Sequence, residues 1–214
     1  KIPLGSGLGS SSSAVLAGMF GANALAGSPL TRQEILQLAT DLEGHPDNVA
    51  PAVHGGLVLG IQGSKGLIVE QFQIPSLNVV IVLPDYQLLT AEARAALPDH
   101  IPLQDAIFNA SRIGLLIRAL ETADYKKLHC AMQDRLHQPY RIQLIPGMKD
   151  AFQAAAEAGA AGVALSGAGP SLIAFAPERH QEISAAAVST FARAGYACRT
   201  WHLPVDTIGV IVSA

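Results

Sequence analysis

The chain has 214 residues, half of them hydrophobic and 14% charged, which is enough apolar material for one large or two small packed domains and excludes an intrinsically disordered chain. Its formal net charge of −3 gives no basic surface for nucleic acid, and no apolar run is long enough to span a membrane. Two cysteines are too few for a disulfide framework or a zinc site, so we expect a cytoplasmic protein with no nucleic-acid or membrane partner.

A loop of glycine and serine opens the chain, and its residues 3 to 13 read PLGSGLGSSSS. Glycine allows positive φ and lets a ligand approach the backbone, while the apolar helix predicted over residues 11–26 has unpaired N–H groups at its start. Together these features predict an anion site, which we interpret as a site for nucleotide phosphates. A flexible linker is the alternative, but a linker would not continue directly into an apolar helix.

Two better-known phosphate loops do not fit this segment. A Walker A loop needs a lysine before its serine, and no lysine lies between Lys1 and Lys65. The dinucleotide fingerprint would need glycine where Ser10 stands. Because a phosphate loop normally follows a strand and only two residues precede Pro3, we also expect an upstream segment that this sequence does not contain.

The predicted elements continue with one more helix and a hairpin before a change in composition at Pro75. Thr31 and Glu34 form a capping box for a helix that runs to Leu42. Strands are expected over 55–60 and 67–72, joined by a turn at 63–66. The change at Pro75 predicts a domain boundary, which divides the chain into residues 1–75 and 76–214.

The second domain is predicted to combine helices with short strands. Helices are expected over 90–96, 103–121, 125–135, 149–158 and 182–194, and strands over 77–83, 162–166, 171–176, 196–203 and 207–212. This order of elements predicts an α+β fold with a layer of helices on an antiparallel sheet.

The polar stretch EGHPDN, residues 43 to 48, holds the first candidates for chemistry. Glu43 ends a helix, where a carboxylate opposes the helix dipole, and a Mg²⁺ ion held between it and nucleotide phosphates would explain that placement. The alternative is a solvated surface glutamate. His45, Asp47 and Asn48 place an imidazole, an acid and an amide within four residues, which favours a functional cluster, although Asp47 and Asn48 could simply cap the next helix.

Further candidates lie in the second domain. Thr90 and Arg94 are four residues apart and therefore share one face of a helix. Arg141 is suited to bidentate capture of a carboxylate or phosphate, although either arginine could be an ordinary surface charge. Residues 166 to 171, SGAGPS, form a second small-residue turn, which indicates close approach of the backbone to a ligand, with an ordinary hairpin as the alternative.

Three motifs together resemble those of the GHMP small-molecule kinases. They are the loop from Gly5 to Ser11, the stretch EGHPDNVAP followed by a glycine pair, and LSGAGPS near the C-terminus. The stretches HPDNVAP and QPYR make the chain similar, within that family, to the homoserine kinases. The resemblance covers essentially the whole chain. It implies the GHMP kinase fold, with an incomplete N-terminal domain like domain 2 of ribosomal protein S5 and a ferredoxin-like C-terminal domain.

The resemblance also implies an activity and its participants. The activity is the ATP-dependent phosphorylation of L-homoserine to O-phospho-L-homoserine in threonine biosynthesis, with Mg²⁺ as the metal and a homodimer as a possible assembly. Another GHMP kinase acting on mevalonate or a sugar is the sibling alternative. A non-catalytic remnant that binds nucleotide or a partner is the alternative from another class, because family members carry an upstream segment that this sequence lacks.

Residue roles follow from the positions of the motifs. The resemblance places ATP against Pro3, Leu4, Gly5, Ser6, Gly7, Leu8, Gly9, Ser10, Ser11 and Ser12. It places the metal near Ser11 and Glu43. It places the substrate against His45, Asn48, Thr90, Arg94, Arg141, Gly167, Ala168 and Gly169. Asn48, Glu43 and Arg141 are the expected catalytic residues. The homoserine kinases are thought to work without a dedicated base, which agrees with phosphoryl transfer relying mainly on positioning and charge stabilisation.

Overall fold

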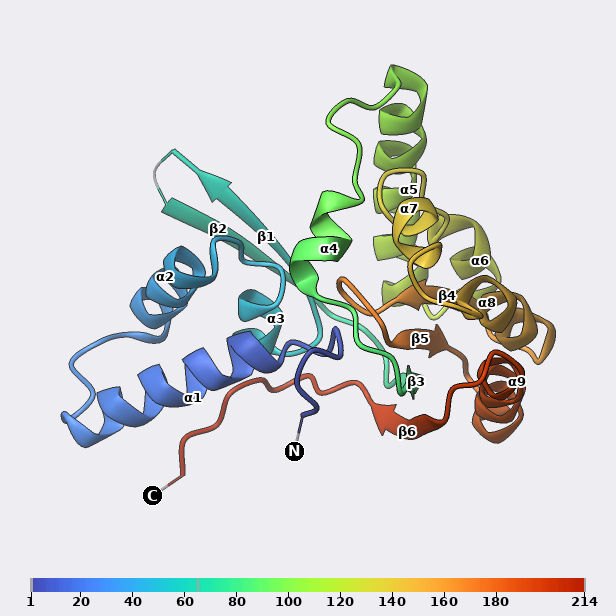
Figure 1. Ribbon diagram of the computed structural model, residues 1–214. Helices are drawn as coiled ribbons and strands as arrows, with labels where there is room; N and C mark the ends of the chain where they lie inside the picture. Colours follow the sequence, from blue (N-terminus) through green and yellow to red (C-terminus); the bar gives the residue numbers. More distant parts are fainter. Residues whose placement is uncertain (1, 65, 214) are drawn as a thin grey trace. The chain divides into compact units, whose positions relative to one another are not determined.

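The computed structural model describes residues 2–64 and 66–213, which form two compact units (Figure 1). The helical unit comprises residues 9–74 together with the C-terminal residues from Val205, and the sheet unit comprises residues 3–8 and 75–204. The chain thus passes from the first unit to the second between Ile74 and Pro75. The division differs from a single linear boundary because the segments 3–8 and 205–213 each cluster with the unit that is distant in sequence.

The helical unit packs three helices with a two-stranded hairpin. Its elements are α1 (Ser10–Leu25), α2 (Arg32–Glu43), α3 (Val49–His54), β1 (Leu57–Gly63) and β2 (Gly66–Phe72). The two strands are antiparallel, with Leu57 opposite Phe72. The core consists of buried residues from all three helices and from β2, namely Leu16, Phe20, Ile35, Leu36, Ala39, Val49, Ala50, Val53 and Leu67.

The ends of α2 follow from local sequence. Thr31 Oγ1 accepts a hydrogen bond from the N–H of Glu34, and the Glu34 carboxylate accepts one from the N–H of Thr31, so the predicted capping box is present. The hydrogen bonds that the Thr31 N–H and the Thr31 hydroxyl donate to the Glu34 carboxylate lower the pKa of Glu34. The hairpin predicted after this helix is also present, although Lys65 in its turn lies outside the described residues.

The sheet unit is built on a four-stranded antiparallel sheet of order β4-β5-β3-β6 (Figure 1). Its strands are β3 (Asn78–Pro84), β4 (Gly162–Leu165), β5 (Leu172–Phe175) and β6 (Cys198–Pro204). The apolar run of β3 is almost entirely buried at an inner position of the sheet. Helices α8 (Met148–Glu157) and α9 (His180–Arg193) pack together and contribute, with the strands, to one hydrophobic core, so the predicted α+β layering is confirmed.

The remaining helices connect β3 to β4. They are α4 (Thr90–Ala95), α5 (Leu103–Glu121), the 3₁₀ helix η1 (Tyr125–Lys127), α6 (Leu128–Ala131) and α7 (Gln138–Ile142). The single helix predicted over 125–135 is wrong, because helical structure stops at Ala131 and α7 begins afresh at Gln138. The carboxylate of Asp134 accepts hydrogen bonds from three consecutive backbone N–H groups and so starts the new helix instead of continuing the old one.

The strand predicted over 207–212 is also wrong. The N–H of Val210 donates to the carbonyl of Val53 at the end of α3, and the carbonyl of Val210 accepts from the guanidinium of Arg32. Asp206 accepts from the N–H groups of Ile208 and Gly209, which bends the segment. These polar groups bond to a helix end, a side chain and a local turn, so the segment forms no sheet ladder.

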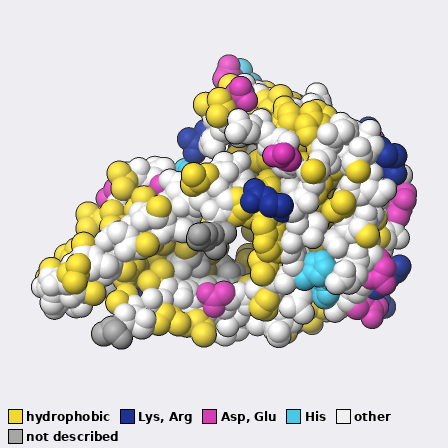
Figure 2. Space-filling model, turned by 60° about the horizontal axis from the view of Figure 1, so that its bottom comes forward, with side chains coloured by type: hydrophobic (Ala, Val, Ile, Leu, Met, Phe, Trp, Pro, Cys, Tyr) yellow, Lys and Arg dark blue, Asp and Glu magenta, His cyan; other side chains and the backbone are white. Residues whose placement is uncertain are grey.

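Among the described residues, no helix is both long and apolar enough to cross a membrane. On the face shown in Figure 2, lysine and arginine side chains are dispersed among hydrophobic and uncharged polar groups. This distribution agrees with the low charged fraction of the sequence.

Candidate active site

The start of α1 leaves backbone N–H groups available to an anion. Gly9 precedes the helix with a φ of 71°, a left-handed conformation that favours glycine, and no side chain caps the helix start in the described structure. Ser13 donates both its N–H and its hydroxyl to the carbonyl of Gly9. The amides of the first helical turn therefore lie at the positive end of the helix dipole, the arrangement that binds phosphate.

Glu43 reaches the same helix start from the last position of α2. Its Oε1 accepts a hydrogen bond of 2.7 Å from the Ser11 hydroxyl, and its Oε2 accepts one of 2.9 Å from the Ser12 hydroxyl. Ser11 and Glu43, which the family resemblance places near the metal, are thus in contact although they are 32 residues apart in sequence. Sequence reasoning gave Ser12 to the nucleotide alone and did not place it on Glu43.

The donor set of Glu43 and Ser11 fits Mg²⁺, an ion that binds one or two carboxylates together with phosphate oxygens. Both side chains present oxygen atoms, and Glu43 is half-buried beside the helix start. No group of three or more His, Cys, Asp or Glu side chains able to hold a metal occurs among the described residues. A metal bound at this place would therefore take its remaining ligands from phosphates and water.

His45, Asp47 and Asn48 follow α2 in the helical unit. The Asp47 carboxylate contacts Nδ1 of the half-buried His45. Asn48 occupies the N-cap position of α3, but its side chain makes no capping hydrogen bond, so capping does not explain this residue. Its Oδ1 lies 3.8 Å from the point that a Cβ on Gly9 would occupy, which places the Asn48 amide beside the start of α1.

The first half of the glycine loop lies in the sheet unit against the second glycine turn. Only glycine fits at position 7, because a Cβ there would lie 2.1 Å from the carbonyl oxygen of Ser166. The Ser166 hydroxyl donates to the carbonyl of Gly7 at 2.9 Å, and the Ser171 N–H donates to the carbonyl of Ser6 at 3.3 Å. The two small-residue loops, more than 150 residues apart in sequence, therefore pack backbone to backbone.

The other predicted residues of these loops differ in exposure. Ser6 is buried and its hydroxyl donates to the carbonyl of Pro3, whereas Leu4 is 89% exposed. Gly5 and Gly167 are exposed, Leu8, Ser10 and Ala168 are half-buried, and Gly169 is buried.

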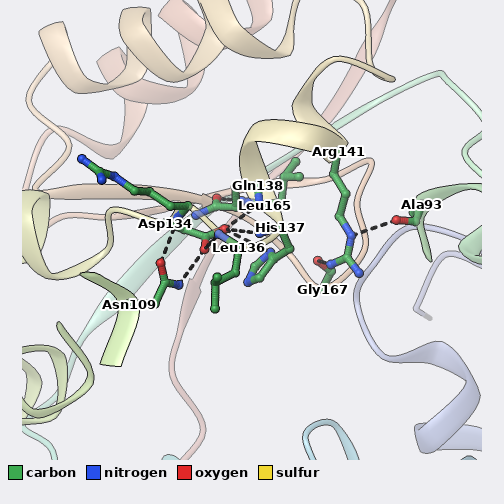
Figure 3. Close-up of polar contacts among 10 residues, drawn as sticks. Ala93, Asn109, Asp134, Leu136, His137, Gln138, Arg141, Leu165 and Gly167 are labelled. Carbon is green, nitrogen blue, oxygen red and sulfur yellow. Dashed lines mark hydrogen bonds and ion pairs between the residues drawn. The ribbon is translucent and has the colours of Figure 1, made fainter. Parts of the chain in front are cut away.

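Arg141 on α7 connects α4 to the second glycine turn. Its Nε donates to the carbonyl of Ala93 at 3.1 Å, and its Nη1 lies 3.5 Å from the carbonyl of Gly167 (Figure 3). Burial lowers the pKa of the Arg141 guanidinium, and the nearby charge of Arg94 lowers it further. Thr90 and Arg94 are both exposed on α4. Two guanidinium groups close enough to repel one another form a place where a carboxylate would be stabilised.

Sequence reasoning missed Asn109 and Asp134, and it gave no role to Gln138 and Ser166 although both lie in motifs that it singled out. The Asp134 side chain is only 6% exposed and joins α5 to the start of α7 (Figure 3). The segment around it, QDRLHQP, has an aspartate four residues before a Gln-Pro pair. That spacing is a signal for a new helix start, and it could have identified Asp134 as a residue that stabilises the chain leading into α7.

The site combines a helix start suited to phosphate with an acidic group beside it, and comparison with known proteins identifies the family. Residues 1–56 match the family described as "GHMP kinases N terminal domain", and residues 116–194 match "GHMP kinases C terminal". The chain therefore belongs to the GHMP kinase family.

Within the family, the chain is similar to homoserine kinases. It is 44% identical over 213 residues to the homoserine kinase of Moorella thermoacetica, covering 99% of this chain and 72% of that protein. It is 53% identical over 174 residues to that of Gloeobacter violaceus, covering 81% of this chain and 58% of that protein. The chain thus spans between about three fifths and three quarters of the length of these two curated relatives.

Solved structures show the same similarity. The crystal structure of homoserine kinase from Cytophaga hutchinsonii matches with a TM-score of 0.90 and 34% identity, covering 98% of this chain and 69% of that one. The structure of mevalonate kinase from L. major, solved in complex with R-mevalonate, matches with a TM-score of 0.72 at 20% identity and so shares the fold alone. The resemblance detected in the sequence is confirmed.

Proposed function

We propose that the protein transfers the γ-phosphoryl group of ATP to the hydroxyl group of L-homoserine and forms O-phospho-L-homoserine, a step of threonine biosynthesis. The observation that carries the proposal is the pair of serine hydroxyls bonded to the Glu43 carboxylate at the uncapped start of α1. This arrangement joins an anion site to an acidic oxygen ligand, as ATP with Mg²⁺ requires. The similarity to homoserine kinases selects the acceptor.

The nucleotide side of the reaction is assigned to the glycine loop. Backbone N–H groups at the start of α1 bind phosphate oxygens, and Ser11 with Glu43 holds Mg²⁺. When bound, Mg²⁺ neutralises charge on the phosphates. The packed backbones of the Gly7 and Ser166 segments keep the loop in one conformation, so binding costs little ordering entropy.

The amino-acid side is assigned to the arginines of α4 and α7. Arg94 and Arg141 bind the carboxylate of homoserine, with Thr90 as a further polar contact and residues 167–169 closing over the substrate. The family resemblance also assigns His45, in the helical unit, to the substrate. The lowered pKa of Arg141 supports this assignment. Burial and the charge of Arg94 both disfavour the charged form of the Arg141 guanidinium, and a bound carboxylate would offset these two effects.

The chemical step needs no dedicated base in this proposal. The hydroxyl oxygen of homoserine attacks the γ-phosphorus, the bond from phosphorus to the β,γ-bridging oxygen breaks, ADP leaves, and the hydroxyl proton passes to solvent. Asn48 orients the hydroxyl group. Asp47 is the neighbouring carboxylate, and its contact with His45 engages it in orienting the imidazole. Positioning and charge stabilisation then supply most of the rate, as in other phosphoryl transfers.

The test is ADP release measured in a coupled assay on the natural full-length protein, with L-homoserine, mevalonate, galactose and no acceptor in parallel. We expect Mg²⁺-dependent turnover with L-homoserine. Turnover only with mevalonate or galactose would favour another kinase of the family. Nucleotide binding without any turnover would favour a non-catalytic protein.

The same proposal places the enzyme in the cytoplasm, acting on a small molecule and not on nucleic acid or membrane. A homodimer stays a prediction, which the molecular mass in solution would test.

A further inference from the structure

Asp134 is a buried carboxylate that the proposed reaction does not use. Its side chain is 6% exposed, yet it lies in the short connection between α6 and α7 and not in the hydrophobic core. A charged group buried to this degree is costly unless it is fully hydrogen-bonded, so its surroundings should explain its presence.

Those surroundings satisfy both carboxylate oxygens (Figure 3). Oδ1 accepts hydrogen bonds from the Asn109 side chain and from the N–H of Leu136, both at 2.7 Å. Oδ2 accepts from the N–H of His137 at 3.1 Å and from the N–H of Gln138 at 2.5 Å. Burial alone would raise the pKa of Asp134, but the hydrogen bonds from Gln138, Leu136 and Asn109 lower it overall, which keeps the group ionised.

The helix that Asp134 starts carries two residues that reach the candidate site. Gln138 is buried, and its Oε1 accepts from the N–H of Leu165 at 2.9 Å, at the end of β4 and immediately before the second glycine turn. Arg141, one turn further along α7, bonds to Ala93 and approaches the carbonyl of Gly167. A shift of α7 would therefore move both the arginine and the anchor of the glycine turn.

A further link is electrostatic. The charge of Asp134 raises the pKa of Arg141, and it opposes the lowering that burial and Arg94 produce. His137 interacts with both residues. Burial lowers the pKa of His137, Asp134 opposes that lowering, and Arg141 adds to it. The carboxylate thus stabilises the cation that would receive the substrate.

We propose that Asp134 is a positioning residue for the amino-acid substrate, which acts through α7 by fixing the place of Arg141 and of the glycine turn at residues 166–170. This inference rests on the proposed function, because the substrate that Arg141 and the glycine turn are taken to bind is homoserine. It assigns Asp134 no contact with substrate and no part in proton transfer.

The first test is a double-mutant cycle that combines Asp134→Asn with Arg141→Lys in the natural full-length protein. An asparagine of the same size keeps one acceptor oxygen and presents an NH₂ group to the other donors, so α7 loses part of its support. We expect Asp134→Asn to raise the KM for homoserine about tenfold with the KM for ATP changing less than about twofold, the size of effect that loss of charge-assisted hydrogen bonds produces. If Asp134 acts through Arg141, the free-energy change that corresponds to the rise in the KM for homoserine should be clearly smaller in the double variant than the sum of the changes in the two single variants.

Thr190→Val is the matched control, because it removes a buried hydroxyl that bonds within α9 of the same unit and leaves α7 untouched. It should lower thermal stability without changing the KM for homoserine. If Asp134→Asn does not fold, Asn109→Ala in the same cycle removes one of the four hydrogen bonds and should act in the same direction with a smaller effect. Strict additivity with Arg141→Lys, or an equal rise in both KM values, would overturn the proposal.

The second test does not depend on activity. Amide hydrogen exchange of Asp134→Asn should accelerate together in residues 136–142 and 165–167, while α9 keeps its protection. If the wild-type protein does not phosphorylate homoserine, the proposed function fails and this exchange pattern still decides whether Asp134 holds α7 and the glycine turn. Unchanged exchange in both segments would refute the positioning role even in an active homoserine kinase.

Discussion

Replacing Glu43 by glutamine separates the folding role of this side chain from its role toward the metal. Glutamine has the same shape, and the hydroxyls of Ser11 and Ser12 can rotate to donate to its oxygen and accept from its NH₂ group, so both contacts can be kept. Losing charge assistance costs about 1 kcal/mol of folding free energy, and removing an anion from the C-terminal end of α2 returns about 0.3–1 kcal/mol. The free energy of unfolding should therefore change by less than about 1 kcal/mol.

The effect on catalysis should be far larger. A carboxylate that binds the metal contributes charge that the neutral amide lacks, and the loss of such a group costs roughly 3–4 kcal/mol of transition-state stabilisation. At 1.36 kcal/mol for each factor of ten, kcat/KM should fall about 10²–10³-fold. The apparent Mg²⁺ concentration for half-maximal rate should rise as well, because the site has lost a ligand.

The assay is coupled ADP release across a Mg²⁺ titration at saturating ATP and homoserine, with thermal unfolding measured on the same preparations. Glu70→Gln is the matched control, since Glu70 is an exposed glutamate on β2 of the same unit, and it should leave both rate and metal dependence unchanged. A folded Glu43→Gln protein with a rate within about fivefold of wild type and the same Mg²⁺ dependence would refute the metal assignment.

Four other substitutions test separate parts of the proposal. Arg141→Lys keeps the charge but loses the planar fork, so it should raise the KM for homoserine more than that for ATP, and an equal rise in steady-state kinetics would place Arg141 outside substrate binding. Gly7→Ala would put a Cβ 2.1 Å from the Ser166 carbonyl at a φ of 77°, so calorimetry should show weaker ATP binding, and unaltered affinity would contradict the packed loop. Asp47→Asn should lose much less than the ~10²–10⁴-fold that a general base supplies, whereas Asn48→Ala should lower kcat through poorer orientation of the hydroxyl. A fall in kcat of about 10³-fold for a folded Asp47→Asn protein, as expected when a general base is removed, would identify Asp47 as the general base.

Features that depend on neighbours in sequence were predictable. The capping box of Thr31 and Glu34 needs only the residues within it, and the structure has it. The helix over Leu103–Glu121 has the predicted bounds, because its length and apolar spacing leave little competition from other structures. The hairpin of β1 and β2 follows from two short apolar runs that flank a glycine-containing turn.

Features that depend on distant partners were not predictable from local pattern. The helix expected over 125–135 ends at Ala131, and Asp134 in the connection that follows is held by a hydrogen bond from Asn109, which is 25 residues away. The strand expected near the C-terminus is absent, because the guanidinium of Arg32, 178 residues away, donates a hydrogen bond to the Val210 carbonyl. The contact between Ser11 and Glu43 was not predicted: the family resemblance placed both residues near the metal, and spacing alone left Glu43 as either a ligand or a surface charge.

The candidate site concentrates unfavourable charges in each unit separately. Glu43 places an anion where the dipole of α2 opposes it, at a cost of about 0.3–1 kcal/mol. In the sheet unit, the pKa of Arg141 is lowered by burial and by the charge of Arg94. The Ser11 and Ser12 hydroxyls already stabilise the Glu43 carboxylate, and a bound cation would offset the remaining opposition of the α2 dipole. At Arg141, a bound carboxylate would offset the effects of burial and of Arg94. This complementarity supports the assignment of metal–nucleotide to the first and amino acid to the second, because each ligand brings a charge opposite in sign to that of the side chain it would meet.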